Sequence, residues 1–261
     1  MRLQAALLSI ALCAAPAALA AQGLAPGSSH GASYGAADPR ADLARHEATL
    51  AVDSTDYEAN WRAALALIDL GKQSPDDHAD PARDSLYARA ERLARRAVQA
   101  RPDDAQGHFV LANAVGRASL TKSKKERVRR ATEIRSEALR AIELDASHDG
   151  AYHVLGRWNA EIMRLSGVAR FFAKRFLGGA VFDQASWASA VSNMEKAVEL
   201  NPTQIYHRLD LATVYADVGR YADARAQLER VASLPERDVM DAEYKREAAA
   251  LLRKLADRRD S

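Results

Sequence analysis

The stretch Pro202-Thr-Gln-Ile-Tyr-His-Arg-Leu-Asp-Leu-Ala-Thr-Val-Tyr-Ala-Asp-Val-Gly-Arg-Tyr-Ala-Asp-Ala-Arg225 decides the fold. Its apolar residues recur one helical turn apart, which places them on one face of a first helix. A glycine then permits a turn, and small and apolar residues continue the buried stripe along a second helix. The residues at these positions are Leu211, Tyr215, Gly219, Ala224 and Leu228. The stretch therefore predicts a helix–turn–helix unit.

The unit has the length of a tetratricopeptide repeat. A second proline, Pro235, follows Pro202 after 33 residues, against a period of about 34 for this repeat. One such unit cannot bury its apolar face alone, so neighbouring units are expected. We predict an all-α, tetratricopeptide-like, right-handed helical solenoid of about eleven helices without a sheet, and proteins of this kind usually bind other molecules.

The prolines mark a junction that recurs earlier in the chain. Arg101-Pro-Asp-Asp104 and Asp145-Ala-Ser-His-Asp149 repeat the pattern of Leu200-Asn-Pro202, at spacings of 44 and 56 residues. The middle repeats are thus longer than the standard one. The extra residues fall between the two helices of each unit, around Thr121–Arg130 and Ser166–Asp183. The last helix, expected over Asp238–Ala256, has a polar side suited to capping the array.

The N-terminus reads as an export signal. Met1-Arg2 precedes an apolar run to Leu19, and Ala18-Leu-Ala20 is a small-residue cleavage site, so residues 1–20 form an expected signal peptide. A membrane anchor is the alternative. Residues 21–39 are rich in Gly, Ala, Ser and Pro and are expected to be a flexible linker to a repeat domain over residues 40–257. We expect a periplasmic or secreted protein.

Composition and motifs narrow the function. The formal charge of +2 gives no reason to expect a nucleic-acid partner. The only cysteine, Cys13, lies within the signal segment, so the expected mature chain has no thiol for a disulfide or a metal site. The sequence contains no P-loop, nucleophile elbow or dinucleotide fingerprint, and we expect neither an enzyme nor a cofactor or metal.

Several segments together resemble the regulator of microtubule dynamics family. They are Lys122–Glu126, His148–Trp158, Arg170–Gly179 and Glu195–Pro202. Their order along the chain and the positions of the two insertions contribute to the resemblance. The resemblance spans roughly Trp61 to Leu255 and implies a tetratricopeptide-like fold with an interaction role, which in eukaryotic relatives concerns microtubules and organelle contacts. Because that role needs cytosolic access, the export signal favours a different partner here.

Residues on the first helix of each pair are candidates for a partner-binding groove. The first helices of a solenoid line its concave surface, and positions off the packed stripe face a ligand. These candidates are Asn113, Arg117, His153, Arg157, Glu161, Tyr206 and Asp217. His153, Arg157 and Glu161 share one helix face, and the two arginines can each hold a carboxylate. In the alternative interpretation, Arg157 and Glu161 form an internal ion pair.

Two further segments have two interpretations each. Lys122, Lys124, Lys125 and Arg129 form either an anion-docking patch or a solvated charged helix. The aromatic segment Phe171–Phe182 either packs on the solenoid or forms an exposed patch for a partner or a membrane surface. Apart from an uncleaved N-terminus, this segment is the one expected route to membrane association.

The sequence favours a non-enzymatic scaffold of the cell envelope that binds a protein or peptide in its concave groove. One alternative is a cytoskeleton-associated interaction module, as in the family it resembles. Another is a small-ligand receptor or enzyme whose pocket is closed by the 166–183 insert. The identity of the partner is not encoded in any motif.

Overall fold

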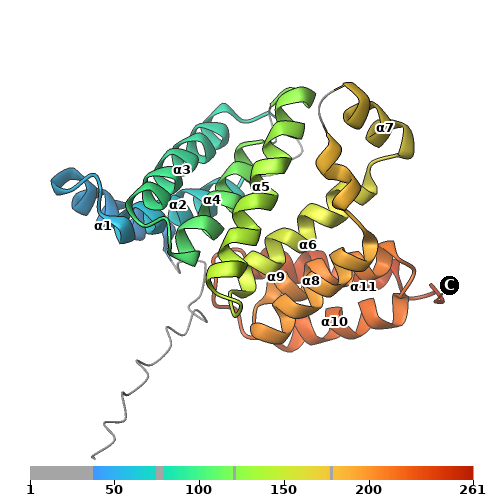
Figure 1. Ribbon diagram of the computed structural model, residues 1–261. Helices are drawn as coiled ribbons and strands as arrows, with labels where there is room; N and C mark the ends of the chain where they lie inside the picture. The colour runs from blue at the N-terminus through green and yellow to red at the C-terminus, as the bar shows by residue number, and fades with distance from the viewer. Residues whose placement is uncertain (1–37, 75–78, 120–121, 177–178, 261) are drawn as a thin grey trace, which may run out of the picture.

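A computed structural model describes residues 38–74, 79–119, 122–176 and 179–260 (Figure 1). The expected signal peptide and nearly all of the expected linker therefore lie outside the described residues. The described part contains eleven α-helices and one 3-10 helix, and no strand. The elements are α1 (Pro39–Val52), α2 (Tyr57–Lys72), α3 (Pro81–Ala100), α4 (Ala105–Ala118), α5 (Lys124–Leu144), α6 (Asp149–Arg164), α7 (Gly167–Phe176), η1 (Ala180–Gln184), α8 (Trp187–Leu200), α9 (Ile205–Asp217), α10 (Tyr221–Ser233) and α11 (Asp241–Lys254).

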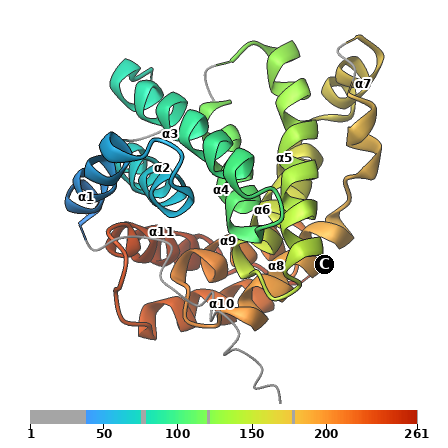
Figure 2. The ribbon, with the colours of Figure 1, turned by 60° about the vertical axis from the view of Figure 1, so that its left-hand side comes forward.

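The helices form successive antiparallel pairs. α2 packs on α3, α4 on α5, α6 on α8, and α9 on α10. Each pair also contacts the next, through α3 and α4, α5 and α6, and α8 and α9 (Figures 1 and 2). α1 covers α2 at one end, and α11 packs on α9 and α10 at the other. This arrangement confirms the predicted all-α, tetratricopeptide-like solenoid.

Small residues set the distance between paired helices. Ala212 of α9 and Ala224 of α10 are fully buried in the C-terminal core cluster. Ala63 of α2 and Ala90 of α3 are fully buried in the N-terminal core cluster. Gly219 joins α9 to α10 with φ 78°, a left-handed conformation that glycine adopts without strain. The quoted stretch therefore folds as its residue pattern predicts.

The junctions between pairs also cap the helices that follow them. At the first junction the Asp104 carboxylate accepts a hydrogen bond from the backbone N–H of Gln106, at 3.0 Å. At the second, His148 Nδ1 accepts one from the N–H of Ala151, at 3.2 Å. Such caps satisfy N–H groups that have no partner within the helix. The junction residues thus end one repeat and start the next.

Two helix boundaries differ from the sequence prediction. The sequence predicts a helix over residues 57–70 that ends at Gly71, but α2 continues to Lys72. Gly71 instead allows a close crossing, because a Cβ there would overlap the ring of Tyr87 on α3. The apolar pattern predicts a helix over Asp84–Ala100, but α3 begins three residues earlier, at Pro81, because Asp80 caps the helix and proline suits its first turn.

The two predicted insertions become helical extensions at one end of the molecule. The first supplies the opening turns of α5, and the second forms α7 and η1. They meet in one apolar cluster, in which Val128 of α5 and Ala173 of α7 pack with Trp158 and Phe182. Both views show the start of α5 and α7 at the top of the molecule (Figures 1 and 2).

Candidate functional site

The first helices of successive pairs form one inner face of the solenoid. α2, α4, α6 and α9 follow one another in contact, and α11 continues the row beside α9. Charges along this face act on one another across several helices. The pKa of Lys72, for example, responds to Asp69 on α2, Tyr244 on α11 and Arg117 on α4. The candidate site is built from these side chains.

A buried histidine pair lies at the centre of this face. His153 of α6 and His207 of α9 place their Nδ1 atoms 2.6 Å apart. Each ring turns its Nε2 atom to a carboxylate: His153 to Asp210 at 2.9 Å, and His207 to Asp149 at 3.0 Å. Both rings are almost completely buried. Asn201 binds Asp149 at 2.8 Å, so the chain of hydrogen bonds continues to the start of the repeat.

This geometry limits where the protons can lie. Asp149 Oδ2 accepts a hydrogen bond from the Asn201 amide and lies 3.0 Å from His207 Nε2, and an ionised carboxylate can accept from both. The two Nδ1 atoms can share a hydrogen bond only if one of them carries a proton. Burial lowers the pKa of His153 well below its ordinary value, with the second ring and Arg157 acting in the same direction. Folding therefore favours the neutral form of His153.

An ionic seam extends the histidine pair along α6 and α9. Arg157 contacts Asp210 at 3.4 Å, and one heptad further on Arg164 contacts Asp217 at 2.6 Å. Arg164 also binds Glu161. Two of the predicted groove residues, Glu161 and Asp217, thus share Arg164. The side chain of Arg157 remains 45% exposed, so its guanidinium is both oriented by Asp210 and accessible.

The α2 side of the inner face carries a buried ion pair. Lys72 and Asp69 lie 2.9 Å apart, with 19% and 5% of their side chains exposed. Burial opposes the charge of Lys72, but Asp69 and Tyr244 outweigh it and raise the pKa of the amine. Burial raises the pKa of Asp69, and the positive charges of Lys72 and Arg117 act in the opposite direction. The half-exposed Arg117 is thus coupled to both α2 charges and to His153.

The aromatic residues of the site lie against the histidines. The Tyr206 ring lies 4.5 Å from that of His153 and 4.4 Å from that of His207, and 6.2 Å from that of Tyr244 on α11. Glu247 lies one turn after Tyr244, near Asp210 and Arg157. Burial is the main cause that raises the pKa of Glu247, and the neighbouring carboxylates raise it further. α11 therefore contributes to the inner face as well as capping the array.

The structure brings most of the predicted groove residues together but gives them unequal access. His153 is buried within the protein, whereas Arg117, Arg157 and Tyr206 retain exposed surface. Asn113 is half-buried on α4. Sequence reasoning missed the partners of the histidine: His207, Asp149 and Asp210. A signal for two of them existed, because Asp210 follows His207 by three residues, on the same face of one helix.

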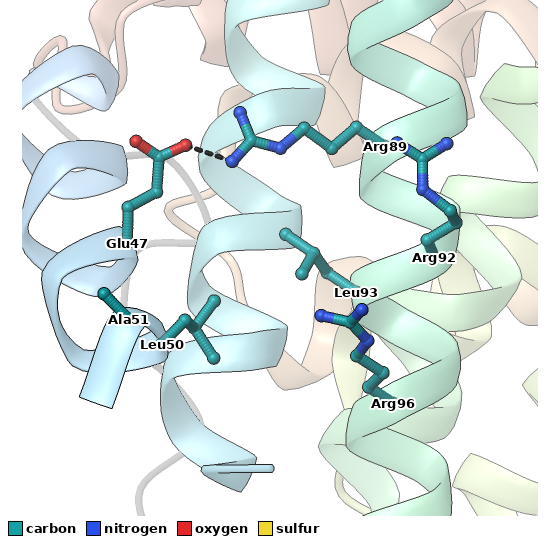
Figure 3. A pocket seen from close by; sticks show the side chains of 7 residues that line it. All are labelled: Glu47, Leu50, Ala51, Arg89, Arg92, Leu93 and Arg96. Carbon is teal, nitrogen blue, oxygen red and sulfur yellow. Dashed lines mark hydrogen bonds and ion pairs between the residues drawn. The ribbon is translucent and has the colours of Figure 1, made fainter. Parts of the chain in front are cut away.

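Two shallow cavities lie on the outer helices. One, of about 380 Å³, is lined by α1 and α3 (Figure 3). There Glu47 pairs with Arg89, while Arg92 and Arg96 flank Leu93. The other, of about 750 Å³, lies between α3 and α5 and includes Lys125. Arginine–glutamate pairs line both, which indicates ionic contacts between neighbouring helices.

These features define a tetratricopeptide-like solenoid with a polar inner face. The match to one solved structure supports this fold. A thermophilic TPR protein of Thermus thermophilus is 20% identical, with a TM-score of 0.58 over 82% of this chain and 91% of that one. MamA, at 15% identity, covers 82% of this chain and 88% of its own with a TM-score of 0.41. A human IFIT1 dimer with PPP-AAAA is 16% identical, and the match covers 84% of this chain and 54% of that one with a TM-score of 0.43.

The family is shown by sequence. The model of the family described as regulator of microtubule dynamics protein 1-3 matches residues 41–256, and this chain belongs to that family. No curated protein sequence matches it significantly. This match confirms the family that was predicted from four segments and their order along the chain.

Proposed function

We propose that this protein is a non-enzymatic scaffold of the cell envelope that binds an extended segment of a partner protein along its inner face. The tetratricopeptide-like fold, whose members generally bind proteins or peptides, supports a binding role. The export pattern of residues 1–20 supports the location. In this proposal the partner contributes a carboxylate, which contacts Arg157 and Arg117.

The observation that carries the proposal is the position of Arg157. Its guanidinium lies 3.4 Å from Asp210, which in turn lies 2.9 Å from the buried His153, so a chain of ionic contacts links the arginine to the core. A side chain that is fixed before binding loses less conformational freedom on contact with a ligand. Nearly half of its surface is nevertheless accessible. Because a guanidinium carries five N–H donors, such an arginine can bind a second carboxylate as well.

The neighbouring groups suit a peptide with mixed character. Tyr206 and Tyr244 offer aromatic surface between the arginines and α11. Glu247 faces Arg157 and Asp210 from α11. A ligand that places an acidic group near Arg157 and an apolar group near the tyrosines would satisfy both. A fully acidic ligand would meet the carboxylates of Asp210 and Glu247.

The other functions considered for the sequence have less support. A small-ligand pocket closed by the insert needs α7 to cover the inner face. The described residues of the insert instead pack with Val128 of α5 and with Trp158 and Ile162. The alternative of a cytoskeleton-associated module rests on the family's name alone.

A peptide-display selection tests the proposal with a random library in place of the natural partner. The library would be selected on the purified protein, on Arg157→Gln and on Arg140→Gln. Arg140 is the matched control, since it lies on the outer helix α5, is 40% exposed and pairs with one carboxylate, that of Glu143. We expect sequences with an acidic residue near an apolar one to be enriched by the wild type and by Arg140→Gln. Equal enrichment by Arg157→Gln would refute the proposed contact.

A further inference from the structure

The two insertions place an apolar surface and a basic surface at the same end of the molecule. The apolar part is on α7 and the residue preceding its first turn: Val168, Phe171 and Phe172 expose 68%, 61% and 55% of their surface, and Leu165 exposes 39%. Their spacing puts them on the outer side of the helix. The opposite side, with Ala173, packs into the apolar cluster formed with α5. We call residues 122–129 and 165–175 the insertion end.

The basic part lies at the start of α5. Five cations there are exposed: Lys122, Lys124, Lys125, Arg127 and Arg129. Among the described residues, ion pairs at this segment join Glu126 to Arg129 and Arg130. The remaining four cations have no carboxylate partner in the described part of the chain. On α7, Lys174 pairs with Asp183, and Arg175 lies one turn beyond Phe171.

The start of α5 and α7 contribute to one apolar cluster. Val128, in the second turn of α5, shares an apolar cluster with Ala173 of α7. The Trp158 indole donates a hydrogen bond to the carbonyl oxygen of Ala131 at 2.7 Å, which ties α6 to the same part of α5. Figures 1 and 2 both show the two segments at one extremity. The cations and the exposed aromatics therefore lie at the same end of the molecule.

We infer that the insertion end docks on the surface of an anionic lipid bilayer. Exposed Phe and Val side chains on one side of a short helix enter the boundary between headgroups and acyl chains, and nearby Lys and Arg side chains bind anionic headgroups. This is an interfacial contact, because none of the described helices is long and apolar enough to cross a membrane. Bilayer docking would orient the inner face of the solenoid relative to the membrane.

The size and charge of the surface favour a bilayer over a second protein. The four exposed apolar side chains offer on the order of 400 Å² if a complete aromatic side chain offers ~150–250 Å². A stable protein interface buries ~800 Å² on each partner. Two copies of this chain would also bring their unpaired lysines together. An anionic bilayer presents an apolar layer beneath negative charges, which matches both parts of the insertion end.

The first test places a reporter on α7. A polarity-sensitive fluorophore would be attached to Val168→Cys in the full chain, with Cys13→Ser to remove the single natural cysteine. The control carries the label at Val52→Cys, which is 91% exposed and lies on α1, the first helix of the array. With vesicles of phosphatidylcholine and phosphatidylglycerol, we expect a blue shift for the α7 label alone. Absence of this shift would overturn the inference.

The second test measures co-sedimentation with the same vesicles. Phe171→Ser with Phe172→Ser should weaken binding about tenfold or more. Each of Lys124→Gln and Lys125→Gln should weaken it about fivefold at low salt, with a smaller effect at high salt. Val52→Ser is the control and should bind as the wild type does. All variants retain the N-terminal segment, so any contribution from it is the same throughout.

Four other results would overturn the inference. Equal binding of all variants would assign membrane binding to another part of the chain. Equal binding to pure phosphatidylcholine would remove the role of the cations. A concentration-dependent dimer that Phe171→Ser abolishes would assign the surface to a second copy of the chain. An equal fluorescence shift with a single-stranded oligonucleotide and no lipid would assign it to nucleic acid.

Discussion

His153 Nδ1 and His207 Nδ1 lie 2.6 Å apart in the buried interior between α6 and α9, and each ring binds a carboxylate through its other nitrogen. Four polar groups thus satisfy one another where the third and fourth helix pairs meet. A buried group that loses such a partner costs free energy, because the remaining charge is neither solvated nor paired. The histidine pair therefore couples the stability of the solenoid to the geometry of its inner face.

Replacing one histidine should destabilise the protein strongly. His207→Leu removes an imidazole that binds both Asp149 and His153. We expect the free energy of unfolding to fall by about 3–5 kcal/mol, the range for breaking a buried ion pair. Urea denaturation monitored by circular dichroism would measure the change. His46→Leu, at a half-exposed position on α1, is the control, and a loss of similar size there would show that the pair is not special.

The stability should depend on pH through His153 in the acidic range. Its pKa is lowered on folding, so the unfolded chain binds a proton that the folded chain does not. Stability should then be present above about pH 6.5, the ordinary value for histidine, and fall as the pH decreases below it, by up to about 1.4 kcal/mol per pH unit for one proton. Urea titrations over a pH series would test this. A flat acidic limb would contradict the neutral state of His153.

His108 should act with the opposite sign. The Glu137 carboxylate, at 2.5 Å from Nδ1, raises the pKa of His108 against the effect of burial. Its contribution should be complete below about pH 6.5 and be lost as the pH rises through the raised pKa. His108→Gln should therefore lower stability at acidic pH and have a smaller effect at alkaline pH. An effect that is constant with pH would mean that the histidine acts only as a neutral hydrogen-bonding group.

Two helical glycines should respond differently to alanine. A Cβ at Gly156 of α6 would lie 2.8 Å from Met194 Cγ and 3.2 Å from its backbone nitrogen on α8. Gly156→Ala should cost about 1–3 kcal/mol through overpacking. Gly116 of α4 has its nearest neighbour at 3.8 Å, so Gly116→Ala should stabilise the helix by about 0.5–1 kcal/mol. Thermal unfolding would compare them, and equal effects would contradict the close packing of α6 on α8.

Much of the fold could be predicted because repeat structure is encoded locally. Apolar periodicity, Gly219 and the recurring junctions each specify one turn or one face. Gly71 was misread because a glycine that ends a helix and one that admits a neighbouring aromatic ring look the same in sequence. The difference depends on Tyr87, which comes from the next helix.

The site was less predictable because its contacts join distant segments. His153 and Arg157 could be placed on the inner face from their spacing alone. Their partners His207 and Asp210 lie more than fifty residues away, and only the packing of α6 against α9 shows the pairing. The sequence likewise left open whether the aromatic insert is buried. The structure divides it, with Phe182 buried in the core and Phe171 and Phe172 exposed.

The most direct test of the proposed function is a double-mutant cycle between Arg157 and a peptide carboxylate. A peptide enriched by the wild type would be titrated calorimetrically, with its acidic residue intact or changed to the amide, against the wild type, Arg157→Gln and Arg140→Gln. We predict a coupling energy of about 1–3 kcal/mol for Arg157, the range for a charged hydrogen bond, and none for Arg140. A coupling energy of zero at Arg157, in a variant that folds as stably as the wild type, would contradict the proposed binding site.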